Sequence, residues 1–299
     1  MVIIQVAGGL GNQLQQYALY RKFVRLGREA RLDVSWFLDK KQKNEVLAER
    51  ELELAYFDRL VYEVCTEEEK AALIGEDGPK GRLRRKLFPA TVHWFKESKM
   101  YHPELLGFEN MYISGYFACE KYYGDILYDL REKIQFPPSV NPRNSQLMEE
   151  MRGCEAVSIH VRRGDYLDAQ NAAMFGGICT DAYYKAAIAL VRQQREKVHF
   201  YVFSDDIRFA AAHYTGDDFT IVDVNHGRDS FYDIQLMSCC KHNICANSTF
   251  SFWGARLNGN ENKIMVRPFI HKNGQVFVKE EMQELWQGWS FVDSQGKVR

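Results

Sequence analysis

The sequence predicts an α/β protein with two domains, each built around a parallel sheet. Short apolar, β-branched runs alternate with helical segments in both halves of the 299-residue chain. A glycine-rich turn follows the first apolar run, and a proline-rich segment separates the halves. Successive parallel strands need crossover connections, which are usually helices, so this alternation favours parallel sheets. Two such sheets joined by a linker predict two domains that face each other across a cleft.

The first half opens with a strand, a turn, a helix and a second strand. Residues Val2–Val6 are apolar and β-branched, which predicts a strand, and the glycine turn Ala7–Gly11 follows. Apolar residues recur at helical spacing from Asn12 to Leu26, and Gly27 predicts the helix end. Ala30–Val34 is the next expected strand. Together these segments predict a βαβ unit.

The rest of the first half contains a charged segment, an aromatic strand and a linker. Residues 66–88 are polar and charged, which predicts a surface insertion. Its basic residues are interpreted as a solvated face: Arg82, Arg84, Arg85 and Lys86. A membrane-surface role stays open, although the sequence shows no apolar face that supports it. Residues Tyr112–Phe117 are strand-like, and Phe136–Pro142 holds three of the seven prolines. The predicted domains are therefore 1–140 and 141–299.

The second half repeats the strand–helix alternation five times. The expected strands are Ala156–Val161, Val198–Phe203, Phe219–Val224, Asn243–Ala246 and Lys263–Arg267. The expected helices are Asp181–Arg195 with Thr180 as its N-cap, Ile207–Tyr214, about Ser230 to Lys241, and a short one ending at Leu257. This repetition predicts a second parallel sheet.

Composition excludes several classes of protein. With 39 basic and 40 acidic residues, the net charge is −1, so no overall field favours nucleic acid. Seven scattered cysteines without CxxC pairs argue against a disulfide framework or a structural zinc site. No leader or long apolar segment is evident, so we expect a cytoplasmic protein with no integral membrane segment.

The strongest chemical signal is the segment His160-Val161-Arg162-Arg163-Gly164-Asp165-Tyr166, which follows an apolar strand. Because side chains alternate along a strand, His160 and Arg162 would leave its carboxyl end together. Ligands of open α/β sheets bind at that edge. The guanidinium fork suits a phosphate, and Arg163 adds a second cation. A polar turn without a ligand is the alternative interpretation.

Two further junctions are expected at the same edge. Ser204, Asp205 and Asp206 follow one strand, and Asn247, Ser248 and Thr249 follow another at a helix N-terminus. Helix N-termini favour anions, although these side chains would also serve as ordinary helix caps. A carboxylate here suits a purine or a ribose hydroxyl. The combined pattern predicts a site for a nucleoside diphosphate.

The glycine turn of the first half is a weaker signal. Gly9 belongs to a tight turn that needs no ligand, whereas Asn12 and Gln13 at the helix start are left without a structural explanation. Asp205 and Asp206 are adjacent, so their side chains would point apart rather than converge on Mg²⁺. We therefore expect neither a metal nor a cofactor.

Four segments in this order resemble the α-1,2-fucosyltransferases of glycosyltransferase family 11. They are Gly8-Gly9-Leu10-Gly11-Asn12-Gln13, the His160–Tyr166 segment, Val202-Phe203-Ser204-Asp205-Asp206 and Asn247-Ser248-Thr249-Phe250-Ser251-Phe252-Trp253-Gly254-Ala255. Gly115-Tyr116-Phe117 also resembles the family. Gln15 and Phe252 depart from it, since phenylalanine and tryptophan are usual there. The departure at Gln15 puts helix packing or acceptor shape in doubt, and that at Phe252 is conservative.

The resemblance implies transfer of L-fucose from GDP-fucose to the 2-hydroxyl of a terminal galactose, with inversion and without metal. It implies a GT-B fold, with two Rossmann-like domains facing across a cleft and the nucleotide on the C-terminal one. Because animal members carry a membrane anchor that this chain lacks, a bacterial cytoplasmic enzyme for surface polysaccharide or O-antigen is expected. Its partners would be GDP-fucose and a galactose-terminated oligosaccharide.

The resemblance also implies residue roles. Arg162 would bind the β-phosphate, His160 would support it or the nucleotide, and Asp165 would orient the arginines. Donor contacts are expected from these residues: Arg162, Arg163, Ser204, Asp205, Asp206, Asn247, Ser248 and Thr249. Gly9, Asn12, Gln13, Tyr116 and Phe117 are expected near the cleft, where the general base would lie.

Two alternatives to this function stay open. The first is transfer of another nucleotide sugar, or of fucose to another hydroxyl. The second is a non-catalytic glycan-binding protein that stacks sugars on Trp94, Tyr116 or Trp253.

Overall fold

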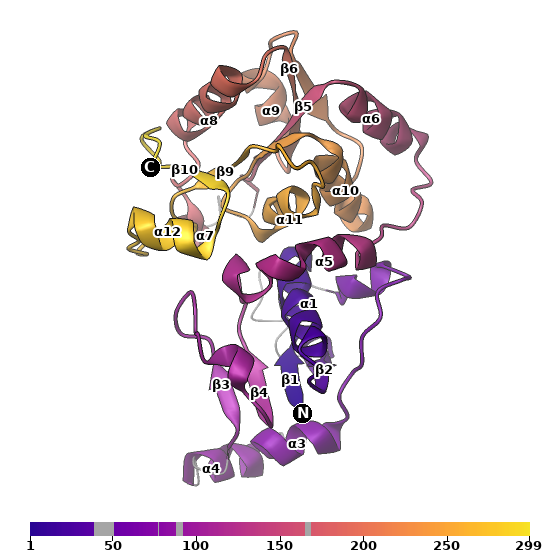
Figure 1. Cartoon of the computed structure of the whole chain (residues 1–299), viewed down its shortest axis with the longest axis vertical. Coiled ribbons are helices and arrows are strands. Elements are labelled where there is room, and N and C mark those ends of the chain that lie inside the picture. The colour runs from indigo at the N-terminus through magenta and orange to yellow at the C-terminus, as the bar shows by residue number, and fades with distance from the viewer. Residues whose placement is uncertain (39–50, 77, 88–91, 165–168) are drawn as a thin grey trace. The chain divides into compact units, whose positions relative to one another are not determined.

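The computed structural model describes residues 1–38, 51–76, 78–87, 92–164 and 169–299. The chain divides into two compact units, Met1–Gln135 and Phe136–Arg299 (Figure 1). The division lies five residues before the domain boundary expected after residue 140. Each unit contains a parallel sheet, so the predicted α/β class is confirmed. The expected cleft concerns the placement of the two units and stays a prediction.

The first unit contains a four-stranded sheet in the order β2-β1-β4-β3. Its strands are β1 (Val2–Gln5), β2 (Ala30–Asp33), β3 (Trp94–Lys96) and β4 (Met111–Ser114), and all pairings are parallel. From β1 the chain goes to the edge strand β2, then crosses to the opposite edge at β3 and returns inward to β4, beside β1.

Helix α1 (Leu10–Arg25) follows the glycine turn and begins at Leu10, two residues before the expected start. Gly9 is its N-cap and contributes no side chain, so the helix starts without a side-chain cap. Leu14, Tyr17 and Ala18 are fully buried, as the helical spacing predicts. The helix thereby covers the sheet and fixes the turn after β1.

The charged segment at residues 66–88 forms two helices, α3 (Glu67–Ile74) and α4 (Pro79–Leu87). Thr66 and Glu69 form a reciprocal capping box at the start of α3. Leu73 and Ile74 pack in a buried cluster. The prediction of a surface insertion is therefore wrong for α3, because two apolar residues anchor its last turn in the core.

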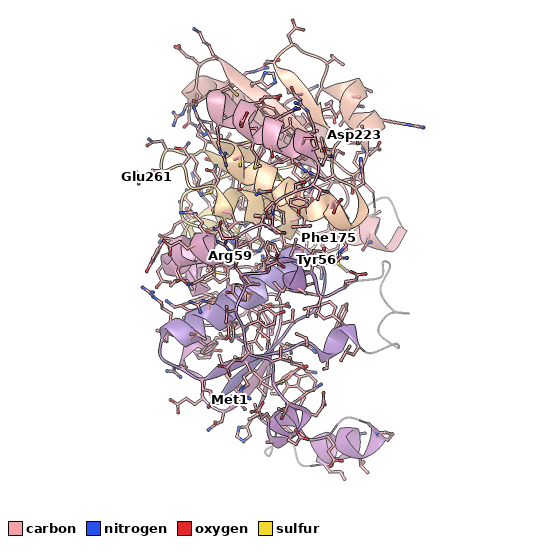
Figure 2. All side chains as sticks on the ribbon, turned by 90° about the vertical axis from the view of Figure 1, so that its right-hand side faces the viewer. Met1, Tyr56, Arg59, Phe175, Asp223 and Glu261 are labelled. Atoms are coloured by element: carbon pink, nitrogen blue, oxygen red, sulfur yellow. The ribbon has the colours of Figure 1, made fainter. Side chains whose placement is uncertain are left out.

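Short helices complete the first unit. They are η1 (Ser35–Phe37), η2 (Glu53–Tyr56), η4 (Leu105–Gly107), η5 (Glu120–Tyr122), η6 (Gly124–Ile126) and α5 (Leu127–Lys133). Figure 2 shows the side chains that fill this unit and the second one.

The second unit contains a six-stranded parallel sheet in the order β10-β9-β8-β5-β6-β7. Its strands are β5 (Glu155–Val161), β6 (Val198–Ser204), β7 (Phe219–Val222), β8 (His242–Ile244), β9 (Met265–Pro268) and β10 (Trp289–Val292). This is the doubly wound order of dinucleotide-binding folds, with its switch point between β5 and β8. Sequence analysis missed β10.

Helices connect these strands. They are α6 (Pro142–Gly153), α7 (Ala169–Phe175), α8 (Asp181–Gln194), α9 (Ile207–His213), η8 (Gly227–Phe231), α10 (Tyr232–Cys239), α11 (Thr249–Leu257) and α12 (Lys279–Leu285). The side chain of Thr180 accepts a hydrogen bond from the backbone N–H of Tyr183, so the predicted N-cap of α8 is confirmed.

The two faces of β5 are buried in different ways. Val157, Ile159 and Val161 lie in the apolar core that includes α8. On the opposite face, Ser158 accepts a hydrogen bond from Asn243 of β8, and His160 lies beside Phe250 of α11. The predicted alternation along this strand is confirmed, and it directs the polar face toward α11.

A buried arginine holds the C-terminal part of the second unit. The Arg267 guanidinium lies 4.3 Å from the ring centre of Phe252, 4.4 Å from that of Trp286 and 5.8 Å from that of Trp289. Cation–π contacts strengthen when the cation is desolvated, and Arg267 is only 1% exposed. This cluster joins α11, α12, β9 and β10.

Packing between α10 and α11 predicts a stability effect at Gly254. A Cβ added there would lie 2.7 Å from Cβ of Met237, which is closer than carbon atoms pack. We expect Gly254→Ala to lower the free energy of unfolding by about 1–2 kcal/mol, overpacking outweighing the gain in helix propensity. Chemical denaturation measures the change.

The matched control is Gly153→Ala, also at a helical glycine, where an added Cβ would meet no atom within 4 Å. This variant should be neutral or slightly stabilising. Equal effects of the two substitutions would contradict the packing argument.

Candidate functional site

Arg162 follows β5 and is paired with Asp205, which follows β6. The parallel register places Val161 opposite Ser204, so the residues after each strand are neighbours. Nη1 of Arg162 lies 3.0 Å from Oδ2 of Asp205. The backbone N–H of Arg163 donates to Oδ1 of the same carboxylate at 2.8 Å. One aspartate therefore holds both the side chain of the first arginine and the backbone of the second.

Arg163 is held by Asp206 and by an aromatic ring. Its Nε lies 3.3 Å from Oδ2 of Asp206, and its guanidinium lies 3.8 Å from the ring centre of Phe209. Asp206 is also the N-cap of α9 and accepts from the Phe209 N–H at 3.0 Å. The Asp206 N–H in turn donates to the Ser204 hydroxyl at 3.0 Å. The expected capping role of Asp206 is confirmed, whereas contact with guanine or ribose stays a prediction.

His160 lies just before these arginines and is 5% exposed. Its ring centre is 5.7 Å from that of Phe250, and its backbone carbonyl accepts from the Tyr184 hydroxyl. Nδ1 is buried without a hydrogen-bond partner within the described residues. Burial and, to a smaller extent, the Arg162 charge lower the pKa of His160 to about 4, against the opposing effect of Asp205. The imidazole is therefore neutral at neutral pH.

The segment after β8 approaches the switch point from the other side. Ser248 is the N-cap of α11 and accepts from the Phe250 N–H at 3.4 Å, which confirms the expected cap. Thr249 is the first residue of that helix and is partly exposed. The first turn of α11 contains no acidic residue, so its dipole would favour an anion.

The Asn247 side chain is hydrogen-bonded within the protein, and its expected contact with the donor stays a prediction. Its Nδ2 donates to the carbonyls of Phe175 and His271, at 3.1 and 3.3 Å, and its Oδ1 accepts from the Cys179 thiol. The side chain thus joins the loops that surround the start of α11. Asp165, which was expected to orient the arginines, lies outside the described residues.

Two glutamines shape the carboxyl edge of the first sheet. Gln13 is fully buried, donates to the carbonyls of Gly8 and Glu51, and accepts from the Leu54 N–H. The prediction that its side chain faces a cleft is wrong, because the side chain is buried and makes all these hydrogen bonds within the protein. Gln16 accepts from the Ala7 N–H and donates to the Gly115 carbonyl, joining the loops after β1 and β4. Asn12, one turn before Gln16, is partly exposed.

Gly115, Tyr116 and Phe117 form a strained loop around Glu97. The carboxylate accepts from the Tyr116 N–H at 2.7 Å and from the Phe117 N–H at 3.1 Å. A Cβ at Gly115 would lie 2.4 Å from Cβ of Glu97, so only glycine fits. Phe117 has a φ of 50°, which is unfavourable for a bulky residue. Backbone strain of this kind often accompanies a functional loop.

Tyr116 and Phe117 differ in what they offer a ligand. Tyr116 is 54% exposed, whereas Phe117 is fully buried, so the expectation that the Phe117 side chain faces a cleft is wrong. Burial raises the pKa of Glu97 in spite of its two backbone hydrogen bonds. Sequence analysis missed Glu97, and the available signal was a carboxylate directly after the short segment Trp94–Lys96.

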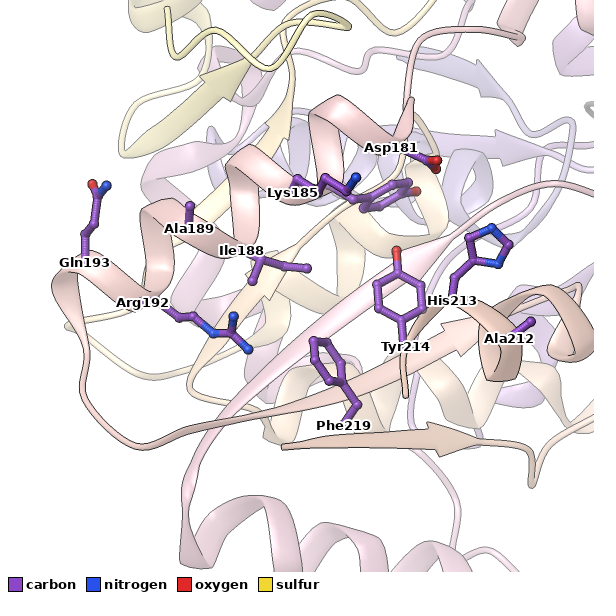
Figure 3. A pocket seen from close by; sticks show the side chains of 11 residues that line it. Asp181, Lys185, Ile188, Ala189, Arg192, Gln193, Ala212, His213, Tyr214 and Phe219 are labelled. Atoms are coloured by element: carbon purple, nitrogen blue, oxygen red, sulfur yellow. The ribbon is translucent and has the colours of Figure 1, made fainter. Parts of the chain in front are cut away.

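A cavity of about 750 Å³ lies away from these groups, between α8, the end of α9 and the start of β7 (Figure 3). Tyr214 and Phe219 project toward α8 in this view. None of the predicted site residues lines it. Within the described residues, no helix is both long and apolar enough to cross a bilayer.

Comparison with known proteins identifies the chain's relatives. The model of "Glycosyl transferase family 11" matches residues 97–293. The O-antigen biosynthesis glycosyltransferase WbnK of Escherichia coli is 31% identical, with 88% of this chain and 92% of that protein covered. An α-1,2-colitosyltransferase of the same organism is 28% identical, with 90% and 91% covered.

The chain belongs to glycosyl transferase family 11. A third relative, the galactoside α-(1,2)-fucosyltransferase 1 of Leontopithecus chrysomelas, is 30% identical over 35% of this chain and 29% of its own length. The match to the family model includes Glu97, Tyr116, the paired arginines and the start of α11. This glycosyltransferase therefore carries its paired arginines inside the matched region.

The buried imidazole of this transferase predicts a pH-dependent stability. His160 has a folded-state pKa of about 4, below its ordinary value, so the unfolded chain binds a proton more readily. The contribution of neutral His160 is complete above about pH 6.5 and is lost as the pH falls toward 4. Over that pH range, we expect the free energy of unfolding of the wild type to fall by up to about 3 kcal/mol more than that of His160→Phe.

Chemical denaturation of both proteins at several pH values tests this expectation. His242 and His271, whose pKa values are also lowered by burial, contribute to both proteins and cancel in the difference. Identical pH slopes for wild type and variant would show that His160 is not buried in its neutral form.

Proposed function

We propose that this transferase moves L-fucose from GDP-fucose to the 2-hydroxyl of a terminal galactose, with inversion and without a metal ion. The observation that carries the proposal is Arg162, oriented by Asp205 at the switch point of the second sheet. The start of α11 enters the same switch point after β8. A guanidinium and a helix N-terminus are both suited to the charge of a diphosphate.

The donor would bind at the second unit through its diphosphate. Arg162 would contact the β-phosphate, while the first turn of α11, with Ser248 and Thr249, would donate hydrogen bonds to phosphate oxygens. Arg163 would add a second positive charge at the site. Asp206 and Phe209 hold its guanidinium in place. With two guanidinium groups available, the leaving diphosphate needs no divalent cation.

The reaction would be a single displacement at C1 of fucose. The galactose 2-hydroxyl oxygen forms the new bond to C1 as the bond from C1 to the β-phosphate oxygen breaks. The hydroxyl proton leaves to a base or to water, and GDP leaves with the bonding electrons. Negative charge grows on the β-phosphate during this step, so Arg162 binds the transition state more strongly than the ground state.

The acceptor would be held at the carboxyl edge of the first sheet. Tyr116 offers an exposed aromatic ring there, and Gly9 and Asn12 lie at the start of α1. Glu97 is a positioning residue in this proposal, because its oxygens already hold the Tyr116 and Phe117 backbone. Trp253 is fully buried, which argues against its use as a sugar platform in a non-catalytic protein.

The named relatives support an α-1,2 transfer, and their names give two candidate donor sugars for this chain. One is an α-1,2-colitosyltransferase, and another is a galactoside α-(1,2)-fucosyltransferase. Colitose is L-fucose without its 3-hydroxyl, so the two donors differ by one hydroxyl group. Transfer of colitose is therefore the second candidate. A site that hydrogen-bonds the 3-hydroxyl would reject the deoxy sugar strongly.

A role in bacterial surface polysaccharide is part of the same proposal. The supporting observation is the E. coli relative named for O-antigen biosynthesis, which matches nearly the full chain. The proposed enzyme would act in the cytoplasm on a galactose-terminated oligosaccharide.

The test is release of GDP from GDP-fucose, in EDTA, with and without a panel of galactose-terminated sugars. We expect release to depend on the acceptor, to yield an α-1,2-fucosylated product, and to be unchanged by added Mg²⁺. GDP-colitose is the matched donor and should react at least about tenfold more slowly. Faster transfer of colitose would favour the second candidate, and no turnover with either donor would contradict the proposal.

A further inference from the structure

Helix α4 (Pro79–Leu87) has a composition that the proposed reaction does not use. Its nine residues include five basic ones and no acidic one. The basic residues are Lys80, Arg82, Arg84, Arg85 and Lys86. The whole chain has a net charge of −1, so this helix is a local concentration of positive charge.

Two leucines of α4 are exposed to solvent. Leu83 is 56% exposed and Leu87 is 60% exposed. They are four residues apart and therefore lie on one side of the helix. Gly81 is buried and lies roughly on the opposite side, at 100° of rotation per residue. The helix thus contacts the rest of the unit through its glycine side and presents leucines outward.

The position of α4 keeps this surface away from the loops of the proposed acceptor site. Figure 1 shows α3 and α4 at the end of the first unit where the chain begins, and the arrow of β1 points away from them. Figure 2 shows the same helices at one end of the first unit, beyond Met1. Tyr116 follows β4 at the opposite, carboxyl edge of the sheet. A surface bound to α4 would leave that edge accessible.

Exposed leucines within a dense run of cations suit an anionic bilayer surface. Basic amphipathic helices lie in the headgroup region, with apolar side chains in the boundary and cations near anionic headgroups. An acidic protein or a nucleic acid would use the positive charge but gain little from two leucines. We propose that α4 docks this transferase reversibly on membranes that contain anionic phospholipids.

Sedimentation of the full-length protein with vesicles tests the proposal, which is independent of donor and acceptor. One set of vesicles contains phosphatidylcholine alone, and the other contains equal parts of phosphatidylcholine and phosphatidylglycerol. We expect binding only to the anionic vesicles, and we expect added salt to weaken it.

Two variants separate the contributions of the helix. Arg84→Glu with Lys86→Glu, two positions that flank the leucine side of the helix, should abolish vesicle binding, and Leu83→Gln with Leu87→Gln should weaken it by roughly tenfold or more. Matched controls place the same changes at exposed sites of the second unit. They are Lys272→Glu with Lys279→Glu, and Val140→Gln with Val276→Gln. Both controls should bind like wild type.

Thermal unfolding and turnover with a soluble acceptor should be unchanged in all four variants, because α4 and the control residues lie outside the proposed reaction site. Equal binding of wild type and the α4 variants would overturn the proposal. Loss of binding with the charge-reversal variant alone would indicate a surface for polyanions and would also overturn it.

Discussion

The ion pair between Arg162 and Asp205 is the interaction on which the proposed site depends. It joins the ends of β5 and β6 and directs a guanidinium toward the point where the sheet order reverses. Both side chains are partly exposed, at 30% and 23%. Pairs of this kind contribute at most about 1 kcal/mol to stability. The main effect of this ion pair is therefore to orient Arg162. A guanidinium that is already held in position loses little conformational entropy when it binds phosphate.

The surrounding packing serves the same purpose. Asn243 donates to Ser158 of β5 and to the Met237 carbonyl of α10, and its Oδ1 accepts from Asn258 after α11. These buried amides bind β8 to its neighbours at fixed distances. Because unmatched polar groups in a core are costly, such a network favours one arrangement of α10, α11 and the sheet. The start of α11 is thereby fixed relative to Arg162.

Much of the fold was predictable because its signals are local. The strands β5, β6, β7 and β9 are mainly apolar runs, and Thr180 caps α8 by accepting a hydrogen bond from the first turn of that helix. The common edge of the arginines and acidic residues follows from parallel topology alone. By contrast, β3 has only three residues, too few for a visible alternation. The burial of α3 was missed because its charged first turn hides Leu73 and Ile74.

The roles of individual site residues were less predictable, because they depend on long-range partners. The ion pairs of Asp205 with Arg162 and of Asp206 with Arg163 were not predicted, and the expected contact of these aspartates with the nucleotide stays a prediction. Glu97 acquires its role only when β3 pairs with β4 and brings the Tyr116 N–H within 2.7 Å. The burial of Gln13 likewise depends on Leu54, which is distant in sequence.

The most direct test of this account is a double-mutant cycle on GDP affinity, measured by calorimetry. Asp205→Asn keeps an acceptor for the Arg163 N–H and removes the charge that orients Arg162. We predict that it weakens GDP binding about tenfold in the wild-type background and has no weakening effect beside Arg162→Ala. An equal loss in both backgrounds would mean that Asp205 contacts the nucleotide directly, and would contradict the account.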